Sequence, residues 1–266
     1  MHMPSNSNDH YAATILADKP VGYWRLNEQS LNDVVVDQSG HCRHGKIVGT
    51  PALSVEGAIQ GSENKSITFI PESYIEIPSS PDFSISTSRE GLTVEVWMRP
   101  DQTEFSPEPG RQYVHWLGKG EPNEREWGFR FYTKHDRKFP NRICAYAWNL
   151  AGDEGAGDDY REPIQIPSPW LHFAACFEPY DANQARSRGV ILYTNGNSGE
   201  GYRTKTTFYE NPGRWHVIPE NGGSPLRFGT RSRTGFLSGG LDEVAIYPKV
   251  LSLEQIWTHY AAGMGR

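Results

Sequence analysis

Two short segments, residues 127–132 and 142–148, alternate arginine and large aromatic residues with residues typical of a protein core. If both segments are β-strands, alternate side chains point to the same side. The residues expected on one face are Arg130, Tyr132, Arg142, Tyr146 and Trp148. Aromatic rings stack on the apolar face of a sugar, and planar polar groups hydrogen-bond its hydroxyls. We therefore predict a carbohydrate-binding face, with a core position for Tyr146 and Trp148 as the alternative.

Chemistry on a bound sugar would need further groups. A polysaccharide lyase needs a tyrosine or histidine base and an arginine that neutralises a uronate, and Arg130, Tyr132, Arg142 and His115 supply these residue types. Residues 152–162 carry five carboxylates and three glycines, which could bind a metal or position an acid. A solvated surface loop is the simpler interpretation of that segment. The sequence contains no Gly-x-Ser-x-Gly and no His-Glu-x-x-His motif.

Most of the chain has the pattern of short β-strands separated by turns. Alternating runs rich in β-branched and aromatic residues are bounded by Gly, Pro and Asn. The predicted strands are residues 22–27, 65–70, 74–78, 92–99, 112–118, 127–133, 142–148, 171–178, 189–194, 202–208, 226–229 and 241–247. Helices are predicted over residues 8–18 and from Ser252, whose side chain would cap the second helix. We predict one domain over residues 11–263, after a disordered or cloning-derived segment over residues 1–10.

The last predicted strand contains an unusual carboxylate. Strict alternation places Asp242 on the same face as Val244 and Ile246. A carboxylate among aliphatic side chains is unfavourable unless it is paired, hydrogen-bonded or bound to a metal. Asp242 is therefore predicted to have a specific partner.

The order and spacing of these segments resemble the laminin-G-like domain of the concanavalin A-like lectin/glucanase superfamily. The segments that carry the resemblance are residues 20–28, 36–45, 66–69, 74–78, 92–100, 170–175, 192–196, 226–229 and 239–254. The resemblance covers nearly the whole chain from Tyr11 to Gly263. It implies an all-β fold, a two-sheet antiparallel jelly-roll sandwich with short terminal helices. It also implies that residues 127–132 and 142–148 are central strands of the concave sheet.

The same resemblance implies a structural calcium ion. Domains of this kind often bind Ca²⁺ with the aspartate of the last strand, here Asp242. Backbone oxygens near Glu28 and Gly45 would complete the shell, with Asp37 as a second carboxylate. The alternative is that Asp242 caps backbone amides or pairs with Arg25.

Function follows less directly, because this fold hosts lectins, adhesion modules and glycan-cleaving enzymes. Glucanases of the fold carry Glu-x-Asp-x-x-Glu on one strand, and residues 127–132 contain no acid. We therefore expect a non-catalytic carbohydrate-binding or adhesion module whose partner is a polysaccharide or glycan. A polysaccharide lyase or glycoside hydrolase that uses the same groove is the first alternative, and a protein-binding adhesion module is the second.

Composition narrows the partners and the compartment. A net charge of −6 without a long basic run argues against strong nucleic-acid binding. No apolar run approaches the length of a membrane span. We expect an extracellular or periplasmic protein that forms part of a larger architecture. Cys144 and Cys176 lie in strand-like runs that could be neighbours, but free buried thiols are the favoured state.

Overall fold

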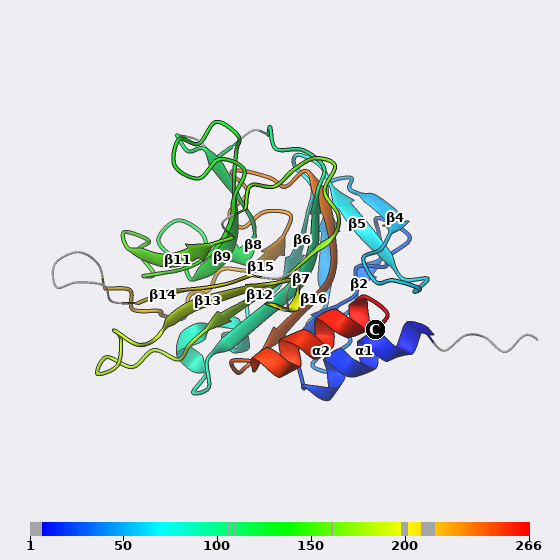
Figure 1. Ribbon diagram of the computed structural model, residues 1–266. Helices are drawn as coiled ribbons and strands as arrows, with labels where there is room; N and C mark the ends of the chain where they lie inside the picture. Colours follow the sequence, from blue (N-terminus) through cyan, green and yellow to red (C-terminus); the bar gives the residue numbers. More distant parts are fainter. Residues whose placement is uncertain (1–6, 106, 109, 161, 198–201, 209–215) are drawn as a thin grey trace, which may run out of the picture.

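The structure is a computed structural model that describes residues 7–105, 107–108, 110–160, 162–197, 202–208 and 216–266. Two antiparallel sheets stack face to face, and helices α1 (Ser7–Ala17) and α2 (Leu253–Gly263) lie together against one of them (Figure 1). Short 3-10 turns occupy Pro81–Phe83, Ile85–Thr87 and Asn195–Asn197. The predicted jelly-roll sandwich with short terminal helices is thus confirmed. Within the described residues, neither helix is long and apolar enough to cross a bilayer.

The first sheet is the one that the helices cover. Its strands in spatial order are β14 (Tyr202–Thr207), β13 (Gly189–Thr194), β12 (Leu171–Phe177), β7 (Leu92–Pro100), β16 (Gly239–Tyr247), β5 (Lys65–Phe69) and β4 (Ala52–Glu56), with β1 (Gly22–Trp24) also paired to β16. Most neighbours in this order are distant in sequence, so the sheet is assembled mainly by long-range pairing.

No helix of the described residues covers the outer face of the second sheet (Figure 1). Its strands in spatial order are β11 (Gly155–Asp159), β10 (Ile143–Trp148), β9 (Trp127–Tyr132), β8 (Tyr113–Lys119), β15 (Leu226–Phe228), β6 (Tyr74–Ile77), β3 (Gly45–Val48) and β2 (Val34–Val35). Strands β8 to β11 form consecutive antiparallel pairs, so side chains from four neighbouring strands share one outer face.

Strand β7 explains why the helices are needed. Val94, Val96 and Met98 enter the core between the sheets, as the alternation predicts. Trp97 points to the opposite side, into a second apolar cluster under α1 and α2, where its indole Nε1 donates a 2.9 Å hydrogen bond to the Tyr11 hydroxyl. The first sheet is therefore apolar on both faces, and the helices remove the outer face from water.

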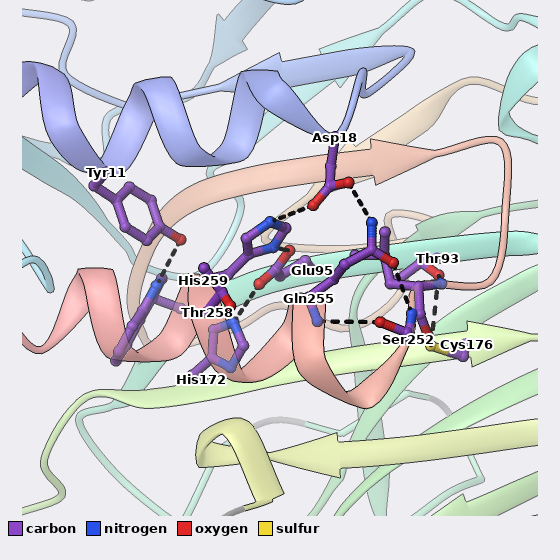
Figure 2. A network of polar contacts seen from close by, with 12 residues as sticks. Tyr11, Asp18, Thr93, Glu95, His172, Cys176, Ser252, Gln255, Thr258 and His259 are labelled. Carbon is purple, nitrogen blue, oxygen red and sulfur yellow. Dashed lines mark hydrogen bonds and ion pairs between the residues drawn. The ribbon is translucent and has the colours of Figure 1, made fainter. Parts of the chain in front are cut away.

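A buried polar network pins the helices to the first sheet (Figure 2). Glu95 of β7 accepts hydrogen bonds from His172 of β12 at 2.6 Å and from His259 of α2 at 2.8 Å. The other ring nitrogen of His259 lies 3.0 Å from Asp18, directly after α1. At the start of α2, Ser252 forms the predicted N-cap as part of a capping box. Strands β7 and β12 and helix α2 thus meet at the Glu95 carboxylate, and His259 links them to the end of α1.

The facing predicted for Asp242 is wrong. Leu241 of β16 pairs with Met98 and Asp242 with Trp97, but Glu243 has a φ of 51° and the register then shifts by one residue. This bulge puts Asp242 on the helix side, whereas Val244 and Ile246 point into the core. A single extra residue therefore reversed the parity that strict alternation had assigned.

Four strands were not predicted: β2, β3, β4 and β11. Strand β11 lies inside the acidic segment 152–162, which is therefore an edge strand of the second sheet and not a loop throughout. Its glycines hide a strand signal, because glycine has little intrinsic preference for the extended form. Residues 216–224 form no strand, and none of the predicted strands falls there.

The cysteines are all free thiols. Cys144 belongs to the second sheet and Cys176 to the first, where Cys176 contacts Thr93 under the helices. The two buried thiols are therefore held in different layers and do not form a pair.

Candidate functional site

The outer face of the second sheet carries the predicted aromatic and arginine residues. The core contains Phe129 and Phe131 of β9 and Ile143 of β10. The residues that alternate with them along each strand therefore point outward. The outward set includes Arg130, Tyr132, Tyr146 and Trp148. Because strands β8 to β11 continue this face, the side chains of four strands converge over it.

A pocket of about 280 Å³ opens on this face. Its lining includes Tyr113 and His115 from β8, Arg130 from β9, and Tyr146 and Trp148 from β10. Loops add charged side chains, which are Glu108, Arg111, Arg125, Asp153 and Arg231. The pocket thus joins the sequence-predicted face to residues that sequence analysis did not assign to a ligand.

Arg130 lies among aromatic rings. Its guanidinium carbon is 3.8 Å from the ring centroid of Tyr113 and 4.3 Å from that of Tyr146. One terminal nitrogen donates to the Tyr132 hydroxyl at 2.8 Å, and Nε lies 3.3 Å from Nε2 of His115. Burial opposes the charge of Arg130, but neighbouring tyrosines outweigh that cost and raise its pKa. The cation is therefore held in one orientation.

His115 continues this chain of hydrogen bonds to a carboxylate. Its Nδ1 contacts Oε1 of Glu108, and burial together with the charge of Arg231 lowers the pKa of His115 to about 3. The imidazole is thus neutral, donates to Glu108 and accepts from Arg130. Burial opposes the charge of Glu108, but the hydrogen bond from His115 and the charge of Arg231 hold its pKa below the ordinary value. Glu108 is an anion that orients His115.

Arg231 forms the opposite wall. Its guanidinium carbon lies 4.7 Å from the Trp148 ring centroid, and its aliphatic stem passes Gly118 and Gly128, which are paired across β8 and β9. A Cβ at Gly118 would lie 3.2 Å from Cγ of Arg231, so the absence of side chains makes room for the stem. Among the described residues, Nε and one terminal nitrogen of Arg231 find no hydrogen-bond partner. Burial lowers the pKa of Arg231 to about 10; the charge of Glu108 opposes this shift, and the charges of Arg125 and Arg130 add to it.

Two glycines of β11 make room for the rings of Tyr146 and Trp148, which form the aromatic wall of the pocket. Gly155 pairs with Trp148 and Gly157 with Tyr146. A Cβ at Gly155 would lie 2.5 Å from Cδ1 of Trp148, and one at Gly157 would lie 2.4 Å from Cγ of Tyr146. The two rings stack on each other at a centroid distance of 5.4 Å and an interplanar angle of 16°. The glycines of the acidic segment therefore shape the site directly.

Arg142 lies apart from the other predicted residues. It donates to Asp159 at 2.7 Å and does not line the pocket. Tyr132 does not line the pocket either, but its hydroxyl accepts from Arg130. Arg231, Glu108 and Arg125 were missed as ligand-binding candidates because they come from loops, where alternation gives no facing. One usable signal was the pair Gly118 and Gly128, which leaves the outer face bare at adjacent positions.

The carboxylates expected to bind calcium are hydrogen-bonded to the protein. Asp242 is fully buried and accepts from the Ala58 amide at 2.7 Å and the Asn64 side chain at 3.2 Å. The Arg25 pairing assigned to Asp242 as an alternative belongs to its neighbour: Arg25 donates to Glu243 at 2.9 Å. Burial and the charge of Glu243 raise the pKa of Asp242.

Asp37, Glu28 and Gly45 lie in the predicted N-terminal region. Asp37 accepts from the amides of Tyr23 at 3.0 Å and Arg43 at 2.9 Å, and Gly45 begins β3. Glu28 has one buried carboxylate oxygen without a partner, and burial raises its pKa. Among the described residues, no three His, Cys, Asp or Glu side chains are grouped so that they could hold a metal. The Asp37 and Asp242 oxygens are used by N–H donors, so calcium binding stays a prediction.

A larger hollow of about 790 Å³ lies elsewhere, between the segment 56–65, Trp97, Trp170 and the end of α2. Arg99 lies with its guanidinium carbon 5.0 Å from the Trp170 ring centroid at this side of the first sheet. We give the smaller pocket priority because it concentrates charged side chains, buried polar atoms without partners and aromatic rings on one face.

Comparison with solved structures shows the same fold. Domain 4 of AbnA, an extracellular arabinanase from Geobacillus stearothermophilus in complex with arabinotriose, is 16% identical with a TM-score of 0.56, over 91% of this chain and 98% of that one. The binding domain of botulinum neurotoxin DC in complex with SialylT is 10% identical with a TM-score of 0.60, over 94% of this chain and 52% of that one.

The binding domain of Paraclostridial Mosquitocidal Protein 1 is also similar, at 15% identity and a TM-score of 0.59, over 93% of this chain and 53% of that one. This chain spans about half the length of the two toxin binding domains. At these identities the likeness concerns the fold alone.

Sequence comparison identifies the family. No curated protein matches the chain. A family model, Laminin_G_3, described as the concanavalin A-like lectin/glucanases superfamily, matches residues 71–257, which is more than half of the chain. The two stacked antiparallel sheets agree with that match. The chain therefore belongs to the concanavalin A-like lectin/glucanases superfamily.

Proposed function

We propose that the protein is a carbohydrate-binding module that holds a glycan in the pocket on the outer face of the second sheet. The observation that carries this proposal is the convergence of Arg130, Tyr146, Trp148 and Arg231 on one preformed hollow. Planar guanidinium groups suit the hydroxyl and ring oxygens of sugars, and aromatic walls exclude water from the contact. Similar structures solved with arabinotriose and with SialylT support a saccharide as the ligand class.

Binding is favoured over cleavage by the protonation states in the pocket. A glycosidase needs a general acid of raised pKa, whereas the pKa of Glu108 is lowered and its carboxylate is engaged by His115. Burial raises the pKa of Tyr132 and Tyr146, so neither phenol is a ready base at neutral pH. The nitrogen of His115 that could act as a base accepts from Arg130.

We further propose that the protein works outside the cytoplasm as one module of a larger protein. Support comes from the arabinanase that contains the similar domain, which is described as extracellular. Secreted enzymes often carry such modules to keep them on an insoluble substrate, where a modest affinity suffices.

Native electrophoresis through gels that contain single polysaccharides tests the function. We expect at least one polysaccharide to retard the protein, without release of reducing ends or unsaturated products. Trp148→Ala is expected to weaken the retarding interaction about tenfold, because the wall that faces Arg231 is lost.

Tyr74→Ala is the matched control, since Tyr74 is a partly buried aromatic residue of the same sheet, whose ring centroid lies 6.4 Å from that of Phe236, outside the pocket. Release of product would favour the enzyme alternative. If no polysaccharide retards the protein, and Trp148→Ala instead abolishes capture of a protein partner, the module is an adhesion domain and the proposal is wrong.

A further inference from the structure

We propose that the pocket selects a glycan unit that carries an oxyanion, with the anion bound at Arg231. The relevant chemistry is shared by the carboxylate of a uronic or sialic acid and by a sulfate ester. This inference rests on the proposed function and adds to it the class of sugar.

Charge in the pocket is the first argument. Of the described lining residues, four are arginines, namely Arg111, Arg125, Arg130 and Arg231, and two are carboxylates, namely Glu108 and Asp153. His115 is neutral, so the lining has two more positive than negative charges, in a chain with a net charge of −6. Asp153 is exposed and accepts the backbone amide of Glu154. The pocket lining is therefore positively charged, whereas the protein as a whole is negatively charged.

The second argument compares Arg231 with Arg227, because both residues are 2% exposed. Arg227 is fully engaged: it donates to Glu76 at 2.9 Å, to Glu121 at 2.7 Å and to the backbone oxygen of Arg231 at 2.8 Å. Arg231 has two nitrogens without a hydrogen-bond partner, and no carboxylate lies within ion-pair distance among the described residues. Glu108 acts on Arg231 only through its charge, from beyond ion-pair distance, so the buried N–H donors of Arg231 still lack an acceptor. Buried donors without an acceptor are costly, which points to an acceptor from outside the chain.

Arg125 repeats the pattern at the rim. One of its terminal nitrogens donates to the Gly152 backbone oxygen at 2.8 Å, but its Nε is buried without a partner. Arg125 and Arg130 are both close enough to depress the pKa of Arg231. An oxyanion between these groups would remove the repulsion and satisfy the free N–H donors in a single contact.

The third argument concerns the rings. Tyr113 and Tyr146 contact the Arg130 guanidinium, and Trp148 stacks on Tyr146 and lies under Arg231. These contacts occupy ring faces on which a neutral pyranose would stack. The groups that remain available to a ligand are the N–H donors of the buried arginines, and a carboxylate or sulfate is bound by such donors. The volume of about 280 Å³ is slightly below the roughly 300–1,000 Å³ of drug-sized ligand sites and suits one charged sugar unit.

Matched pairs of polymers test the inference. Polygalacturonate and its methyl-esterified form differ in the carboxylate, and dextran sulfate and dextran differ in the sulfate. We expect the protein to bind one acidic polymer at least tenfold more tightly than its neutral counterpart by calorimetry. The pair that discriminates identifies the source of the anion. Added salt is expected to weaken the acidic interaction.

Three variants separate a site from general electrostatics. Arg231→Met keeps the aliphatic stem and removes the charge, and is expected to erase the tenfold preference. Arg231→Lys keeps the charge without the planar donors and is expected to retain part of the preference. Arg233→Gln is the control, because Arg233 is exposed, paired with Glu121 at 2.8 Å and outside the pocket. Thermal unfolding of each variant confirms that it folds.

The outcomes distinguish this inference from the proposed function. Equal or better binding of the neutral polymers overturns the oxyanion and leaves the carbohydrate module standing. Binding of poly-glutamate as tightly as of the acidic glycans, with the same loss in Arg231→Met, overturns the inference in favour of an acidic protein partner. If no polymer binds, the proposed function fails together with the inference.

Discussion

The guanidinium carbon of Arg231 lies 4.7 Å from the ring centroid of Trp148, on a surface left bare by two paired glycines. The contact joins a loop after β15 to the end of β10 and closes one side of the pocket. It provides van der Waals and cation–π stabilisation but leaves two nitrogens of a buried cation without partners. Stability and ligand binding are therefore expected to conflict at this residue.

Arg231→Met is expected to stabilise the ligand-free protein by about 1–2 kcal/mol, because it removes a buried cation whose N–H donors lack acceptors and whose burial outweighs the attraction of Glu108. The pKa of Arg231 is depressed from 12.5 to about 10, so the cation destabilises the fold fully below about pH 10, and this penalty declines as the pH rises from about 10 to 12.5. Chemical unfolding at neutral pH measures the difference.

Arg227→Met provides the opposite control. Its removal leaves Glu76 and Glu121 without their buried partner, but both carboxylates are partly exposed and keep Lys46 and Arg233, so a loss of about 1–3 kcal/mol is expected. A loss of similar size in Arg231→Met would mean that Arg231 is a structural residue whose partner has been missed.

Gly155→Ala is expected to weaken glycan binding at least tenfold, because the new Cβ would lie 2.5 Å from Cδ1 of Trp148 and displace the indole. Tryptophan fluorescence reports the displacement and gel retardation reports the binding. Gly223→Ala is the control, since a Cβ there would meet its nearest neighbour, Glu124, only at 3.6 Å. Unchanged binding in Gly155→Ala would argue against a role of the Trp148 wall.

Helix docking is expected to depend on pH through Glu95 and His259 (Figure 2). Burial alone would lower the pKa of His259, but Glu95 and Asp18 outweigh it and raise that pKa above 6.5. Burial alone would raise the pKa of Glu95, but His259 and His172 hold it well below 4.5. The contribution of His259 is therefore full below about pH 6.5 and lost as the pH rises through its raised value. That of Glu95 is full above about pH 4.5 and lost in acid.

Thermal midpoints measured from pH 4 to 9 check this expectation. The network should stabilise the protein most between about pH 4.5 and 6.5, and the midpoint should fall on the alkaline side. The environment of His259 also includes Lys249, which pairs with Asp18 at 3.2 Å, and the Tyr247 ring at 5.8 Å. In His259→Gln the alkaline fall should become shallower. An identical slope in both proteins would assign the pH dependence to other groups.

Calcium is expected to stabilise the fold if the predicted site near Asp242, Asp37, Glu28 and Gly45 binds it. Ligand binding to the native state raises the melting temperature in proportion to the logarithm of the ligand concentration. The midpoint should fall when a chelator is added and recover with excess Ca²⁺, with Mg²⁺ as the control cation. If chelator, Ca²⁺ and Mg²⁺ all leave the midpoint unchanged, the Asp242 and Asp37 carboxylates only accept hydrogen bonds from protein N–H groups.

Alternation predicted strands β9 and β10 of the candidate site because every second residue of each strand faces the core. Phe129 and Phe131 alternate with Arg130 without interruption, so the period of two placed the arginine outside. The same rule failed at Asp242, because Glu243 adopts a left-handed backbone and inserts one residue into the ladder. The residue types around Glu243 do not predict the bulge. Strand β11 was missed because glycines, chosen here to admit rings, carry no strand preference.

The sequence by itself determined the family fold, most of the strands, and the outward facing of Arg130, Tyr146 and Trp148. Those features depend on the alternation of core and outward residues, and this pattern is repeated within each strand along the chain. Only the tertiary structure decided that Arg231 and Glu108 join them, and that Arg142 is taken by Asp159 instead. These contacts join residues tens of positions apart through loops, and loop geometry is fixed by packing and not by pattern.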